Sequence, residues 1–191
     1  AGSWGTALAV HLARIGHLVR LWSIEPDVVE AVRERRSNAV YLPDIALPPG
    51  IDATLSLAEA VGGAGLVVAA VPSHALRAVL VDAKRLLQPG AVLVSVVKGL
   101  ETGTLLRMSQ VAAEQLPTGH PVVVLSGPSF ALEVAHQSGA VGRVARNALE
   151  QGRIRRQERQ IEQFGIGLLL EVDALLLVAL AVGLLVGIFQ A

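Results

Sequence analysis

Residues 1–22 read AGSWGTALAVHLARIGHLVRLW, and this stretch decides the fold. Gly2 and Gly5 precede a helical pattern that runs from Thr6 to Ile15 and ends at Gly16, and residues 17–22 then have the character of a β-strand. A glycine turn that leads into a helix is typical of a phosphate-binding turn, because the free N–H groups and the positive dipole end of the helix favour an anion. Such a turn normally follows a β-strand, and no strand precedes it in this sequence.

Three apolar runs rich in valine and leucine follow further along the chain. They are Leu66–Val71, Ala91–Val97 and Val122–Leu125. Their lack of polar alternation indicates strands buried on both faces, as in a parallel sheet. Helical patterns near residues 74–87 and 105–116 separate the runs, and this alternation predicts βαβ units. We therefore predict an α/β protein with a doubly wound, mostly parallel sheet of the Rossmann type that lacks its first strand.

The segment between the first predicted strand and these runs contains a helix and a loop. The helix is expected from Pro26 to about Arg36. Three prolines and Gly50 follow between residues 43 and 50, and this composition is typical of a loop.

Composition excludes several classes of function. Among the 191 residues, 16 are basic and 16 acidic, and this balance argues against a nucleic-acid partner. The basic stretch at residues 153–159 fits a solvated helix face better than a nucleic-acid patch. The chain has no cysteine, so disulfides, thiolate catalysis and cysteine metal sites are excluded. Its 5 histidines show no metal-binding spacing, and we expect no metal site.

The apolar tail at residues 174–189 carries no charge. It is shorter than the roughly 20 residues that cross a bilayer, so a buried helix is expected rather than a membrane span. The N-terminus shows no charged region followed by an apolar core, and no secretory signal is expected. The absence of cysteine is compatible with a cytoplasmic location, which we predict.

Ligands of doubly wound sheets bind beyond the carboxyl ends of the strands, where four turns of this chain are expected to meet. Gly2 would let the backbone approach a pyrophosphate, and Gly5 would let the helix pack closely on the sheet. Ser73 follows the first of the three apolar runs, Lys98 follows the second, and residues 126–129 follow the third. A cation at Lys98 is suited to hold a substrate phosphate or to polarise a carbonyl.

Each of these residues also has a plainer interpretation. The glycine turn alone is a weak signal, and a lysine after a buried strand is often only a solvated turn residue. Ser73 and Ser129 are both placed to cap helices. The acidic residue expected after the second strand of a dinucleotide fold is displaced to Glu25, and no arginine stands there, so the sequence leaves NAD and NADP as alternatives.

In this order the turns resemble those of the bacterial-type NAD(P)-dependent glycerol-3-phosphate dehydrogenases. The resemblance covers most of residues 1–135 and is carried by AGSWGTALA, HLVRLW, RRSNAVYLPD, AAVPSHALR, VSVVKGLE and LSGPSFALEVA. It implies hydride transfer between NAD(P)H and dihydroxyacetone phosphate, which gives sn-glycerol 3-phosphate for phospholipid biosynthesis. The implied partner is this small-molecule substrate, and a homodimer is left open.

The resemblance also implies roles for individual residues. Lys98 would lie between cofactor and substrate, and Gly127 and Ser129 would face the substrate. The residues implied at the cofactor are Gly2, Ser3, Trp4, Gly5, Tyr41, Ser73, Lys98 and Ala131.

The resemblance fades after about residue 137. The family's catalytic lysine falls near Gly183, where the chain has no lysine, and none follows Lys98. Without a group that exchanges the hydroxyl proton, we expect this chain to be inactive. The alternative is a non-catalytic dinucleotide-binding module with a regulatory role. The resemblance implies a dinucleotide-binding domain at residues 1–173 and, at residues 174–191, the start of a truncated helical substrate domain.

Overall fold

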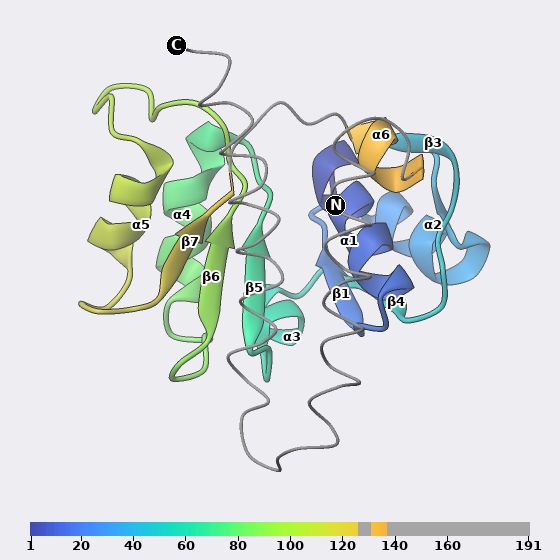
Figure 1. Ribbon diagram of the computed structural model, residues 1–191, viewed down its shortest axis with the longest axis horizontal. Helices are drawn as coiled ribbons and strands as arrows, with labels where there is room; N and C mark the ends of the chain where they lie inside the picture. The colour runs from blue at the N-terminus through green and yellow to red at the C-terminus, as the bar shows by residue number, and fades with distance from the viewer. Residues whose placement is uncertain (126–130, 137–191) are drawn as a thin grey trace, which may run out of the picture. The chain divides into compact units, whose positions relative to one another are not determined.

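The computed structural model describes residues 1–125 and 131–136 (Figure 1). The chain divides into two compact units, Ala1–Ser126 and Gly127–Ala191. The described elements are α1 (Ser3–Arg14), β1 (Val19–Trp22), α2 (Pro26–Arg35), β2 (Ser37–Asn38), β3 (Leu42–Ala46), β4 (Ile51–Thr54), α3 (Leu57–Val61), β5 (Leu66–Ala69), α4 (Ser73–Ala83), β6 (Val92–Ser95), α5 (Met108–Gln115), β7 (Val122–Val124) and, in the second unit, α6 (Ala131–His136).

The parallel sheet is present in two parts. Strands β5, β6 and β7 pair in that order, with Ala69 opposite Ser95 and Ser95 opposite Val124. Strand β1 pairs in parallel with β4, with Leu21 opposite Ala53. Among the described residues β1 pairs only with β4, and β5 only with β6. The parallel pairing in both parts agrees with the predicted α/β fold.

The predicted helices are present with shifted ends. Helix α1 begins at Ser3 rather than at Thr6, because the glycine turn itself is the first turn of the helix. Helix α5 begins only at Met108, because Leu105 has a φ of 58° and cannot continue a right-handed helix.

The prediction of a loop around the prolines at residues 43–50 is wrong in part. Strands β2 and β3 form an antiparallel pair there, and β4 follows at Ile51–Thr54. Pro43 lies within β3, which pairs with β2 alone among the described strands. A proline is tolerated in an edge strand, where its missing N–H leaves no ladder bond unmade. The short strand β4 exists because β1 pairs with it, and no local pattern indicated that partner.

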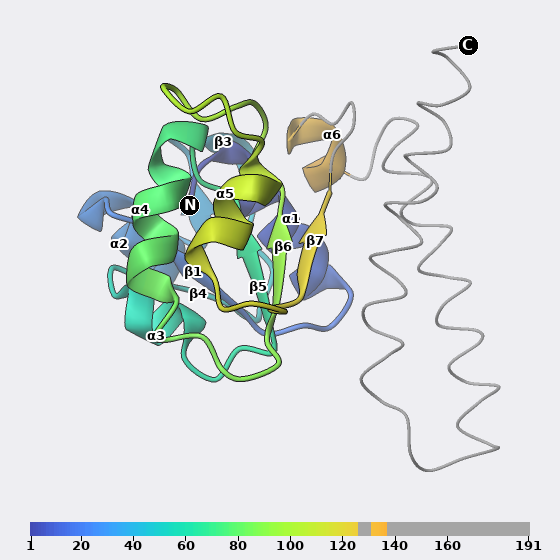
Figure 2. The same cartoon turned by 90° about the vertical axis from the view of Figure 1, so that its left-hand side faces the viewer.

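One apolar core lies between the β5–β6–β7 sheet and helices α4 and α5, which lie side by side (Figure 2). Its buried members are Ala69, Leu76, Leu80, Leu93, Met108, Val111, Ala112 and Leu116. The expectation that all three strands are buried on both faces holds for β6 and is wrong for the other two. Val124 of β7 is 46% exposed, and β7 has a ladder partner on one side only in the part of the chain described.

No helix within residues 1–125 or 131–136 has the length and apolar character needed to cross a bilayer. The uncharged tail at residues 174–189 lies outside the described residues, as does the predicted domain boundary at residue 173.

Candidate functional site

The glycine turn forms the start of α1. Gly2 is the N-cap residue, its backbone is extended, and its carbonyl accepts from the Thr6 N–H at 2.9 Å. No side chain caps this end of the helix, so none of its first-turn N–H groups is taken by a capping side chain. A Cβ built on Gly2 would meet no atom within 4 Å, and the space beside the turn is open to a ligand.

Gly5 brings α1 onto the sheet. A Cβ at this position would lie 3.3 Å from the Cβ of Ala70, which directly follows β5. The prediction that Gly5 permits close packing of helix on sheet is therefore confirmed. The contact places the start of α1 at the carboxyl end of β5, the edge at which ligands of such sheets bind.

Asn38 stabilises the glycine turn through two hydrogen bonds. Its side-chain amide donates to the Ala1 carbonyl at 2.9 Å and to Thr6 Oγ1 at 2.7 Å. Both Asn38 and Thr6 are buried. Sequence reasoning missed Asn38 as a site residue, because its partners lie more than thirty positions away.

Ser3, Tyr41 and Glu25 form a chain of hydrogen bonds at the end of β1. Ser3 Oγ donates to the Tyr41 carbonyl, and the Tyr41 hydroxyl donates to Glu25 Oε1 at 2.9 Å. The bond to this carboxylate, with burial and the negative charge, raises the pKa of Tyr41, so its hydroxyl remains a donor. The displaced acidic residue Glu25 is thus tied to the glycine turn through Tyr41.

Lys98 reaches the glycine turn from the end of β6. Its Nζ lies 5.9 Å from the centroid of the Trp4 ring, at the outer limit of a cation–π contact. The Trp4 indole N–H is buried and has no hydrogen-bond partner. Two turns that are far apart in the sequence therefore meet, as predicted.

Ser73 lies beside the turn that follows Lys98. A Cβ on Gly99, whose φ is 99°, would lie 3.8 Å from Ser73 Oγ. Ser73 is the first residue of α4, and Pro72 is the N-cap, so the interpretation of Ser73 as an N-cap is wrong. His74 is exposed on the same helix.

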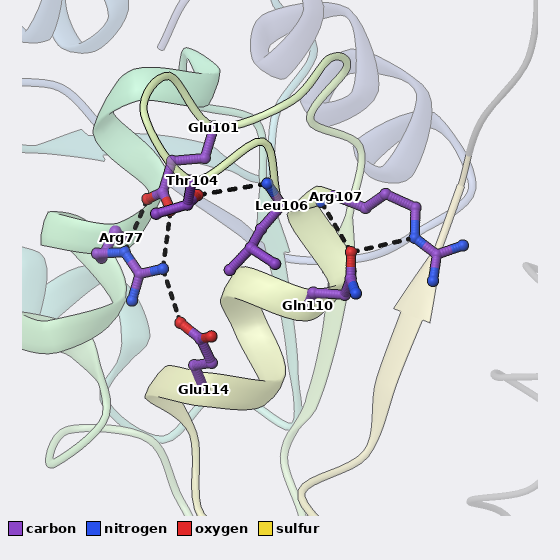
Figure 3. Close-up of polar contacts among 7 residues, drawn as sticks. All are labelled: Arg77, Glu101, Thr104, Leu106, Arg107, Gln110 and Glu114. Carbon is purple, nitrogen blue, oxygen red and sulfur yellow. Dashed lines mark hydrogen bonds and ion pairs between the residues drawn. The ribbon is translucent and has the colours of Figure 1, made fainter.

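The loop after Lys98 is held by an ion-pair network that the sequence did not reveal (Figure 3). Arg77 of α4 donates to both carboxylate oxygens of Glu101, at 2.7 and 2.8 Å, and to Glu114 of α5 at 2.7 Å. Thr104 Oγ1 also donates to Glu101, at 2.6 Å. These bonds lower the pKa of Glu101 to about 2, with the Arg77 contact as the largest cause.

This lowered pKa predicts a loss of stability in acid. The Glu101 carboxylate favours the folded state fully above its unfolded pKa, near 4.5, and this contribution disappears as the pH falls toward about 2. Glu101→Gln, which cannot ionise, should therefore lie closer to the wild type at pH 3 than at pH 7. Urea midpoints at pH 3, 4, 5 and 7 measure this, and parallel curves for the two proteins would contradict it.

Some predicted residues are not placed with the others. Gly127 and Ser129 lie outside the described residues, as does the position near Gly183. Ala131 begins α6 in the second unit. No cluster of metal-binding side chains occurs within the described ranges. The residues brought together in the first unit are Gly2, Ser3, Trp4, Gly5, Tyr41, Ser73 and Lys98.

Comparisons with known proteins match most of this chain to one family. A family model described as the NAD-dependent glycerol-3-phosphate dehydrogenase N-terminus matches residues 1–150. The glycerol-3-phosphate dehydrogenase (NAD(P)+) of Anaeromyxobacter dehalogenans strain 2CP-C is 48% identical over 137 residues, which is 71% of this chain and 41% of the relative. That of Thermobifida fusca strain YX is 46% identical over 148 residues, 76% of this chain and 44% of the relative.

Solved structures give the same result. The crystal structure of glycerol-3-phosphate dehydrogenase from Coxiella burnetii superposes with a TM-score of 0.67 at 39% identity, over 72% of this chain and 42% of that one. The yeast Saccharomyces cerevisiae enzyme superposes with a TM-score of 0.64 at 28% identity, over 72% and 42%. This chain thus spans about two fifths of the length of the curated relatives it matches first.

Proposed function

Because the chain belongs to the NAD-dependent glycerol-3-phosphate dehydrogenase family, we propose that it binds NAD or NADP as the cofactor half of such an enzyme. The reaction of the parent enzyme is hydride transfer between NAD(P)H and dihydroxyacetone phosphate, with sn-glycerol 3-phosphate as the reduced product. The observation that carries this proposal is the position of Lys98 against Trp4 at the glycine turn.

The residues of the turn fit a dinucleotide. The open space at Gly2 suits the approach of a pyrophosphate, and the N–H groups of the first turn of α1 would donate to it. Ser3 and Tyr41 connect this turn to Glu25 after β1, and Trp4 lies near Lys98; we propose that all three contact the rest of the cofactor. We place Ser73 and Ala131 at the cofactor on the family resemblance alone.

Lys98 would act on the substrate side of the cofactor. Its ammonium group can hold the phosphate of the substrate or stabilise negative charge on the carbonyl oxygen. We assign Gly127 and Ser129 to the same substrate from the resemblance of LSGPSFA to the family. The bound nicotinamide would supply the hydride, and the carbonyl oxygen would then need a proton.

The chain lacks the lysine that serves the family as proton donor, since no lysine follows Lys98. We therefore propose that this chain binds its ligands without turnover, and that residues 1–173 are its dinucleotide-binding domain, followed by the start of the helical substrate domain. Its proposed partner is the small-molecule substrate, in a cytoplasmic location and without nucleic acid. A homodimer is compatible with this proposal.

A binding and turnover assay tests the proposal. The 191-residue chain is titrated with NADH and NADPH by nicotinamide fluorescence, and dihydroxyacetone phosphate is then added while absorbance is followed. We expect saturable binding of a reduced dinucleotide and no change in absorbance. Steady oxidation would overturn the proposed inactivity, and the absence of binding to both dinucleotides would overturn the cofactor assignment.

A further inference from the structure

The loop that follows Lys98 is bound to helix α4 through the side chain of Glu101. We infer that Glu101, clamped by Arg77, is a positioning residue that holds Lys98 at the glycine turn and so tunes the affinity for the phosphorylated substrate. The expected effect on substrate affinity rests on the proposed function. The placement of the loop itself can be measured independently of any ligand.

Glu101 is the centre of the loop's hydrogen bonds. Its N–H donates to the Leu106 carbonyl and its carbonyl accepts from the Leu105 N–H, both at 2.9 Å. Its carboxylate accepts from Thr104 and, through two parallel bonds, from Arg77 (Figure 3). The side chain is 12% exposed, so solvent screens these bonds less than those of a surface pair. Arg77 thereby fixes the backbone of the loop as well as one side chain.

Helix α4 supports both ends of this short segment. Ser73 and Arg77 are four residues apart and lie on one face of the helix. Ser73 lies beside Gly99, the residue after Lys98, and Arg77 binds Glu101 two residues further on. Lys98 therefore leaves the sheet next to a segment that lies close to α4 at Gly99 and is bound to it at Glu101.

The backbone of the loop needs such ties. Gly99, Gly103 and Leu105 have φ values of 99°, 93° and 58°. The left-handed region is costly for leucine, and its side chain is 73% exposed and contributes little packing in return. Bonds from Arg77 and Thr104 to Glu101 offset this cost.

Glu114 supplies a matched control. It also accepts from Arg77, at 2.7 Å, but it lies on α5 rather than in the loop. Glu101→Gln and Glu114→Gln each remove one carboxylate from the same guanidinium group. Only Glu101→Gln should release the loop, because only Glu101 belongs to it.

Two ligand-free measurements on the full chain test the placement. In Glu101→Gln, amide hydrogen exchange at residues 99–107 should be faster than in wild type by about tenfold, since bidentate charged bonds are lost. In a Trp22→Phe background, where Trp4 is the remaining tryptophan, the emission of Trp4 should move toward that of Lys98→Met. Glu114→Gln should leave both readouts as in wild type.

Substrate affinity is measured separately, by calorimetric titration with dihydroxyacetone phosphate at saturating NADH. Glu101→Gln should raise the dissociation constant by about five- to tenfold, while Glu114→Gln leaves it unchanged. If exchange and Trp4 emission change but no variant binds substrate, the proposed function fails and the loop placement stands. If Glu101→Gln and Glu114→Gln behave alike in exchange and emission, the positioning role is overturned.

Discussion

Lys98→Ala is expected to weaken the binding of dihydroxyacetone phosphate by about 10- to 100-fold, the range for loss of a hydrogen bond to a charged group. The affinity for NADH should fall by less than about fivefold, because the cation–π contact with Trp4 is a weak interaction at 5.9 Å. Calorimetric titration of the variant with each ligand separates the two effects. We expect this asymmetry because the proposed function assigns the ammonium group to the substrate and the dinucleotide mainly to backbone N–H groups.

The chain offers a close control for this experiment. Its other lysine, Lys84, is the C-cap residue of α4, away from the glycine turn. Lys84→Ala removes the same charge from the chain and should leave both affinities within about twofold, as for other surface changes. Equal losses of substrate and dinucleotide affinity in Lys98→Ala would contradict the position assigned to Lys98 between the two ligands.

Gly2→Ala and Gly5→Val should separate ligand binding from folding. A methyl group on Gly2 meets no protein atom, so the free energy of unfolding should change by less than about 0.5 kcal/mol. The same methyl would occupy the space proposed for the pyrophosphate, and NADH binding should weaken by about tenfold or more.

Gly5→Val should instead destabilise the fold. A Cβ at position 5 would already lie 3.3 Å from the Cβ of Ala70, and the larger valine side chain would clash with it. The free energy of unfolding should therefore fall by about 1–3 kcal/mol.

Urea unfolding and NADH fluorescence measure both quantities on the same samples. Gly65→Ala is the matched control, because a Cβ there also meets nothing within 4 Å and Gly65 precedes β5, at the end opposite the site. Unchanged NADH binding in Gly2→Ala would mean that the cofactor does not approach this turn. A Gly5→Val protein as stable as wild type would mean that α1 does not need its close approach to the sheet.

The site could be predicted where topology alone determines it. Carboxyl ends of parallel strands meet at one edge, so Lys98 and the glycine turn could be brought together from the strand pattern without coordinates. Asn38 could not, because an asparagine after a helix carries no sign that its amide will reach Ala1 and Thr6. Arg77 and Glu101 were missed for the same reason, since charged residues that are 24 positions apart resemble solvated surface residues.

The same distinction explains the fold. Helix α1 and strand β6 have strong local patterns, and both were predicted. The β2–β3 pair was not, because prolines dominate its local signal and an edge strand tolerates them. Strand β4 exists through its pairing with β1, and such pairing is a property of the tertiary structure.

The contact between Gly5 and Ala70 also limits how this sequence can change over generations. The two residues border the same small space, so a methyl group added at either position would be crowded by the other residue. Ala70 has no proposed ligand contact, yet replacement by a larger residue would push α1 away from the end of β5. Selection on dinucleotide binding is therefore expected to restrict the size of the side chain at position 70 rather than its chemical character.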